Sequence, residues 1–235
     1  MHVSTENNST EDKTDKIKDK EDNPTLNVFF DNSTFSNGSV ENTIITIFGD
    51  IDEDASKECV LSIFEAAVQK EMMASVEQSA QKEEKEEEEA KEKTPPLQIT
   101  IKILLSTPGG NAHDFFAIYD AMKCAQDLVE IETVGLGRVM SAGVPILAAG
   151  TKGKRKIGKN CRIMIHPVNA ASMGDIHDIE NDTKEFKTLQ RSYIRCLVES
   201  SNLSEKDVKK ILKKKVNTYF SAEEAIEMGI ADTIL

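Results

Sequence analysis

The stretch EIETVGLGRVMSAGVPILAAG, residues 130–150, joins an apolar run to a run of small and apolar residues through a single serine. The first part has the pattern of a strand, and residues 143–150 have the composition of a short buried helix. Ser141 lies at the turn between them. One interpretation is an N-cap of the helix. The other is a nucleophile on a strand-to-helix turn, although Val139 replaces the first glycine of the usual G-x-S-x-G pattern.

The rest of the chain alternates between strand and helix patterns in the same way. Phe115, Ile118, Met122 and Ala125, for example, share one face of a predicted helix. The expected strands are 43–51, 97–106, 130–139, one or two within 154–167, and 230–235. The expected helices are 55–73, 111–128, 143–150, 175–201, 204–215 and 221–229. This order predicts an α/β fold built from parallel β–α–β units.

Length and composition are those of a soluble globular protein with one domain and charged tails. The chain has 235 residues, of which 39% are hydrophobic and 30% charged. It contains no run of 18 apolar residues, and its first 24 residues lack a signal-peptide core, so we expect a cytoplasmic protein that does not enter a membrane. The net charge of −12 argues against nucleic acid as a partner. The four cysteines lack metal-ligand spacing, which predicts reduced thiols and no metal site.

Two segments have compositions that do not support a packed core. Residues 1–24 are polar and charged, and we expect them to be disordered. The segment QKEEKEEEEAKEKTPP, residues 81–96, is rich in glutamate and lysine and has no apolar face. It is predicted to be a solvated helical extension or a flexible insert that ends at Pro95 and Pro96.

Three predicted strand ends carry unusual residues: STPGG at 106–110, RVMSAG at 138–143 and MIHP at 164–167. The carboxyl ends of parallel strands meet at one edge of a sheet, where functional loops gather. Among the four histidines, His166 is the one that ends an apolar strand. Ser141 and His166 therefore have the residue types and positions of a nucleophile and its base. The alternative interpretations are a hydrogen-bonded core histidine and a simple turn at the PGG sequence.

The combination of S-x-P-G-G with a later M-S-A-G and M-I-H-P resembles the ClpP family, the proteolytic subunit of the Clp protease. The matching stretches are LLSTPGGNAHDFFAIYDAM, GLGRVMSAGVPILAAGTKGKRKIGKNCRIMIHP, the helix from Asp175, and YFSAEEAIEMGIADTIL. The resemblance implies a ClpP/crotonase-like head of ββα superhelix type with a projecting handle helix. It divides the chain into a charged tail, 1–25, and a peptidase domain, 26–235, with an acidic insert at about 75–96 and the handle at about 168–201.

The same resemblance implies roles for individual residues. Ser141 would be the nucleophile and His166 the general base, and the oxyanion hole would consist of the Gly110 and Ala142 backbone N–H groups. The aspartate that completes the family's triad corresponds to Asn217 in this sequence. An asparagine can accept the imidazole N–H, but it supplies no negative charge to an imidazolium. The catalytic activity implied by the family is therefore in question at this position.

The resemblance also implies partners. These are identical or paralogous subunits in heptameric rings that stack as tetradecamers, an AAA+ unfoldase, and a polypeptide substrate. No cofactor is expected, because ATP would be used by the unfoldase. An apolar stripe on the handle helix is expected to contact another subunit; its members are Ile176, Ile179, Phe186, Leu189, Tyr193 and Leu197.

Three hypotheses remain open at this point. The first is an ATP-dependent serine endopeptidase subunit. The second is a weakly active or non-catalytic ring subunit that acts through a paralogue. The third is another enzyme of the crotonase-like fold, such as an acyl-CoA hydratase, which would not need a serine–histidine pair. For the first hypothesis, Asp175 or Asp178 is an alternative to Asn217 as the group that orients His166.

Overall fold

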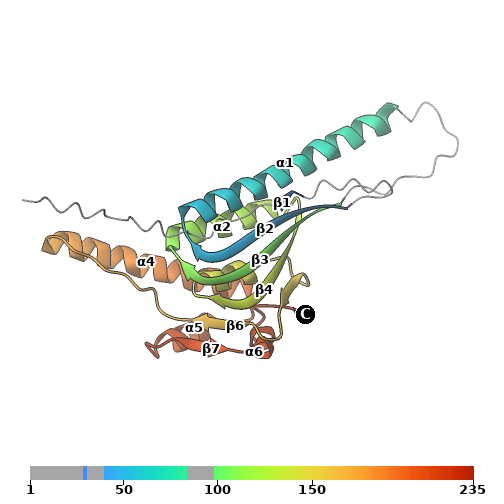
Figure 1. Ribbon diagram of the computed structural model, residues 1–235. Coiled ribbons are helices and arrows are strands. Elements are labelled where there is room, and N and C mark those ends of the chain that lie inside the picture. The colour runs from blue at the N-terminus through green and yellow to red at the C-terminus, as the bar shows by residue number, and fades with distance from the viewer. Residues whose placement is uncertain (1–28, 31–39, 84–97) are drawn as a thin grey trace, which may run out of the picture.

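The computed structural model describes residues 29–30, 40–83 and 98–235, which build one sheet with helices packed against it (Figure 1). The strands are β1 (Phe29–Phe30), β2 (Val40–Ile51), β3 (Gln98–Gly110), β4 (Glu130–Met140), β5 (Arg155–Ile157), β6 (Arg162–Ile165), β7 (Thr218–Phe220) and β8 (Thr233–Ile234). The helices are α1 (Glu53–Glu83), α2 (Ala112–Ala125), α3 (Gly143–Ala148), α4 (Ile176–Ser200), α5 (Glu205–Leu212) and α6 (Ala222–Glu227).

The sheet confirms the prediction of an α/β fold with parallel β–α–β units. Its strand order is β1-β2-β3-β4-β5-β8, and β6 pairs with both β4 and β7. The pairs among β2, β3, β4, β5 and β8 are parallel, as is β4 with β6. Side chains of the central strands, such as Ile45, Ile101 and Ile131, are completely buried. Such β-branched residues suit a strand that is covered on both faces.

Strand β3 is longer than the sequence suggested. The expected strand ended at residue 106, but β3 continues through the PGG sequence to Gly110. Its pairing with β2 also continues, past an irregularity between Phe48 and Asp50, until Ile51 lies opposite Gly110. The interpretation of PGG as a simple turn is therefore wrong, because the neighbouring strand supplies partners for an extended backbone there.

Helix α1 runs ten residues beyond its predicted end at residue 73. Its first half buries Ala55, Cys59, Ile63 and Ala67. Residues 74–83, ASVEQSAQKE, are mostly alanine, glutamine, glutamate and lysine and contain no glycine or proline, so helix propensity favours continuation. Residues 81–83 of the predicted insert are thus helical. The rest of the insert and the N-terminal tail lie outside the described residues.

The C-terminal elements agree closely with the prediction. The expected strand region 154–167 contains two strands, β5 and β6, and Ser204 and Ser221 cap α5 and α6 with capping boxes. Strand β7, residues 218–220, was not expected. It has only three residues and no alternating pattern, and it exists because it pairs antiparallel with β6.

Helix α4 projects from the sheet at its N-terminal end, as the handle prediction requires (Figure 1). Its apolar stripe changes environment along the helix. Ile176 and Ile179 are 69% and 42% exposed, whereas Tyr193 and Leu197 are buried in the head. None of the helices within the described ranges is both long enough and apolar enough to span a lipid bilayer.

The cysteines are free thiols, and three of the four, Cys59, Cys161 and Cys196, are buried. Burial raises the pKa of Cys59 to about 12, so this thiol remains protonated at neutral pH. The prediction of reduced and mostly buried thiols agrees with this arrangement.

Arg155, on β5, is a buried charge that joins the ends of three helices. Its Nη1 donates to the carbonyl oxygens of Ala148 at 3.2 Å, Ser200 at 2.7 Å and Gly229 at 2.7 Å. These carbonyls lie at or just beyond the C-terminal ends of α3, α4 and α6, where backbone acceptors lack helical partners and the helix dipole is negative. Asp232 completes the set, because it accepts from Arg155 Nε at 2.9 Å and Nη2 at 2.6 Å.

We expect Arg155→Ala to lower the free energy of unfolding by about 3–5 kcal/mol, because it leaves a carboxylate and three carbonyls without their donor. Denaturant titration at neutral pH measures this loss. Lys154→Ala is the matched control. The Lys154–Glu130 pair is largely exposed, so its loss should change the unfolding free energy by no more than about 1 kcal/mol.

The Arg155–Asp232 pair also predicts a pH dependence of stability. The hydrogen bonds from Arg155 lower the pKa of Asp232 below its ordinary value. In the unfolded chain an aspartate has a pKa of about 3.9, and above that pH the Arg155–Asp232 pair stabilises the fold in full. This stabilisation is lost as the pH falls through the lower pKa that Asp232 has in the folded protein. Unfolding measured from pH 7 down to about pH 2 should show this acid-dependent loss in the wild type and a smaller one in Arg155→Ala. Parallel curves for the two proteins would contradict the assignment.

Candidate active site

Ser141 lies in a strained turn at the carboxyl end of β4. Its backbone φ is +52°, in the left-handed region that residues with a side chain rarely adopt. The Ser141 N–H donates to the Met164 carbonyl at 2.8 Å, and the Ser141 carbonyl accepts from the Val144 N–H at 3.1 Å. The N-cap interpretation is wrong, because Ala142 occupies the cap position of α3. A non-glycine residue in this conformation is typical of a nucleophile turn.

Two glycines of β3 allow this turn to lie against the neighbouring strand. Gly109 has a φ of +105°, and a Cβ on it would come within 2.6 Å of the Ser141 Cβ. A Cβ on Gly110 would overlap the Ile51 carbonyl oxygen at 2.0 Å. The PGG sequence is therefore required for close backbone approach, both to Ser141 and to β2.

His166 reaches the same place from β6. Strands β4 and β6 pair in parallel with Met140 opposite Met164, so Ser141 and His166 both leave the sheet at its carboxyl edge. They line one cavity of about 460 Å³ together with Gly110 and Ala142. Within the described residues, no hydrogen bond joins the Ser141 hydroxyl to the His166 ring. Such bonds are often long before substrate binds.

The cavity has the features of an acyl-transfer site. The Ala142 N–H has no backbone acceptor in the described part of the chain, as an oxyanion donor requires. The remaining walls are largely apolar and come from α2, the stretch after β6, and α4; they include Phe115, Phe116, Val168, Ala170, Phe186, Leu189 and Tyr193. In the described ranges, no cluster of three or more histidine, cysteine, aspartate or glutamate side chains could hold a metal ion.

Asn217 lies beside the cavity and not among its lining residues. Strands β6 and β7 pair antiparallel with Ile165 opposite Thr218, so extending the register by one residue puts Asn217 opposite His166. Asn217 is exposed, and within the described chain it makes no hydrogen bond to His166. Of the alternative orienting groups, Asp175 caps α4 by accepting from the His177 and Asp178 N–H groups.

Two of the lining residues that the sequence did not single out, His113 and Tyr193, have informative contacts or positions in the structure. His113, which follows the cap of α2, lines the cavity although its sequence context is a charged helix. Tyr193 was assigned only to an apolar stripe, yet its hydroxyl donates to the Ser141 carbonyl oxygen at 3.2 Å. A contact across 52 residues leaves no local pattern by which it could be found.

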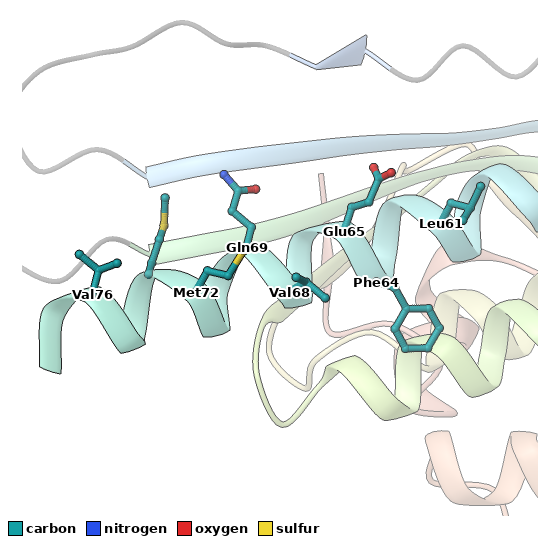
Figure 2. Close-up of a pocket in the computed structure, with 8 residues that line it drawn as sticks. Leu61, Phe64, Glu65, Val68, Gln69, Met72 and Val76 are labelled. Carbon is teal, nitrogen blue, oxygen red and sulfur yellow. The ribbon is translucent and has the colours of Figure 1, made fainter. Parts of the chain in front are cut away.

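A second apolar surface follows the outer side of α1, shown in Figure 2. Its groove has a volume of about 720 Å³. Val68, Met72 and Val76 are 52%, 66% and 68% exposed. Apolar side chains gathered along one exposed helix face are typical of a surface that contacts another protein.

Comparison with known proteins identifies the family of this chain. Residues 89–235, which are more than half of the chain, match the family model described as Clp protease. The chain belongs to the Clp protease family. Gly110, Ser141, His166 and Asn217 all lie within the matched region, whereas the groove on α1 lies outside it.

Individual relatives in the Clp protease family support the assignment. The ATP-dependent Clp protease proteolytic subunit 2 of Frankia casuarinae is 35% identical over 135 residues, which are 57% of this chain and 60% of the relative. Proteolytic subunit 1 of Tropheryma whipplei is 39% identical over 137 residues, 57% of this chain and 64% of the relative. The chain thus spans about six tenths of the length of these curated relatives.

Proposed function

We propose that this protein is a serine endopeptidase subunit of a self-compartmentalised ring protease. The observation that carries the proposal is the convergence of Ser141, in its left-handed turn, with His166 in one cavity. Membership of the Clp protease family supports it. The acyl-CoA hydratase alternative is not favoured, because it gives no reason for a serine in this turn beside a histidine.

In the proposed mechanism, His166 takes the proton of the Ser141 hydroxyl as the oxygen attacks the peptide carbonyl. The negative charge that develops on the carbonyl oxygen is stabilised by the Ala142 and Gly110 N–H groups. His166 then gives the proton to the leaving amine, and water releases the acyl group by the reverse sequence. The apolar cavity walls favour substrates with an apolar side chain next to the cleaved bond.

Labelling with a fluorophosphonate probe tests the nucleophile. We expect the probe to modify Ser141, located by peptide mass mapping, and Ser141→Ala to reduce cleavage of a fluorogenic peptide by at least about 10³-fold. Ser106→Ala is the control, because Ser106 is a half-buried serine on β3 that does not line the cavity. Equal cleavage by wild type and Ser141→Ala would refute the assignment. A wild type that is neither labelled nor active would indicate a non-catalytic subunit.

We propose that Asn217, the residue just before β7, orients His166. Asn217→Asp would keep an acceptor for the imidazole N–H and add a negative charge that stabilises the imidazolium. We expect this change to raise peptide turnover by roughly tenfold and Asn217→Ala to lower it. Turnover is measured for the three proteins in matched oligomeric states. Equal turnover by the three proteins would show that Asn217 does not orient His166 and that another acceptor does.

We further propose that the subunits assemble as rings of seven that stack into tetradecamers, and that a separate AAA+ unfoldase uses ATP to deliver polypeptides. Frankia casuarinae has relatives named proteolytic subunits 2 and 3, which supports assembly from identical or paralogous chains. The exposed half of the α4 stripe supplies an apolar contact surface. The proposed partner for this surface of α4 is another subunit, either a second copy of this chain or a paralogue.

The assembly prediction uses α4, where exposed residues can be changed without disturbing the core. We expect Ile179→Glu to shift sedimentation at micromolar concentration towards smaller species, because it puts a charge into the proposed subunit contact. Asn181→Glu adds the same charge to an exposed polar position of the same helix and should leave assembly unchanged. A wild type that sediments as a monomer, even with its paralogues present, would contradict the proposal.

A further inference from the structure

The carbonyl oxygen of Ser141 accepts two hydrogen bonds from different parts of the chain. One comes from the Val144 N–H in the first turn of α3 at 3.1 Å. The other comes from the Tyr193 hydroxyl on α4 at 3.2 Å. The first bond is local to the turn, whereas the second ties the turn to a helix that begins far away in the sequence.

Tyr193 is firmly held where it makes this bond. Its side chain is 6% exposed, and its ring packs edge-on against Phe115 of α2 with centroids 6.2 Å apart. Burial raises the pKa of Tyr193 well above its ordinary value, so the hydroxyl keeps its proton at neutral pH. The residue is thus a fixed, neutral donor that points at the Ser141 carbonyl.

The bond has a consequence for the next N–H group along the chain. The Ser141 C=O and the Ala142 N–H belong to one planar, trans peptide unit and point in opposite directions. A donor that holds the carbonyl on one side therefore fixes the direction of the N–H on the other side. Ala142 lines the cavity, and its N–H has no backbone acceptor within the described residues.

We infer that Tyr193 is a positioning residue that orients the oxyanion donor: by holding the Ser141 carbonyl, its hydroxyl aims the Ala142 N–H into the cavity. The inference rests on the proposed function, because it takes Ser141 as the nucleophile. It also accounts for the strained turn, since a left-handed residue persists only where surrounding bonds hold it. In this role the Tyr193 hydroxyl acts through the Ser141–Ala142 peptide and not on the reacting atoms, while the Tyr193 ring lines the cavity.

The test compares Tyr193→Phe with Tyr119→Phe. Both changes remove one hydroxyl from a buried tyrosine and keep the ring. The Tyr119 hydroxyl pairs with Ser200 Oγ at 2.8 Å, and within the described residues it makes no hydrogen bond to the Ser141 turn, so Tyr119→Phe controls for a general loss of stability. We expect Tyr193→Phe to lower kcat on a small fluorogenic peptide by roughly threefold to tenfold, the effect of one net hydrogen bond. KM should change little, because the oxyanion contact forms only in the transition state. Tyr119→Phe should leave kcat within about twofold.

A second measurement does not depend on activity. Amide hydrogen exchange of the segment 139–147 should be faster in Tyr193→Phe than in Tyr119→Phe, because the turn has lost a tie to α4. If the two variants agree in kcat and in exchange of this segment, Tyr193 is a packing residue and the inference is wrong. If the wild type has no peptidase activity, the proposed function fails and the exchange comparison alone decides whether Tyr193 holds the turn.

Discussion

The buried guanidinium of Arg155 is the interaction on which the C-terminal half of the molecule depends. A single cation, paired with Asp232, satisfies carbonyls at the ends of α3, α4 and α6. Three helix ends with partial negative charge would otherwise repel one another and lie buried without donors. Arginine suits this position because its planar group offers five donors in fixed directions, which the ammonium group of lysine does not.

This arrangement determines where the active-site elements lie. Helix α3 starts next to the Ser141 turn, and the carbonyl of its last residue accepts a hydrogen bond from Arg155. Helix α4 carries Tyr193, and the carbonyl of its last residue also accepts from Arg155. The turn is held from β6, α3 and α4, which meet only in the folded chain. The strain at Ser141 is therefore supported by the packing of the whole head. This is the physical reason that the strained conformation of Ser141 can be kept.

Much of the candidate site could be predicted because its residues follow strand ends. Ser141, His166 and Gly110 come directly after or at the end of apolar runs, and parallel strands bring such positions to one edge. All three residues line one cavity, as expected if they follow strand ends at the same edge of the sheet. The role of Asn217 could not be decided in this way. Its placement depends on β7, a three-residue strand that has no pattern of its own.

Local patterns in the sequence were enough to predict the α/β alternation, the parallel β–α–β units, the capped C-terminal helices, and Ser141 and His166 as candidate site residues. These features follow from local apolar periodicity and capping residues, which act over a few residues. The extension of β3 through Gly110, the left-handed turn at Ser141, and the contacts of Arg155 and Tyr193 arise only in the folded chain. Each of these features depends on at least one partner between about 50 and 80 residues away in the sequence, which a folded backbone brings close and no local pattern encodes.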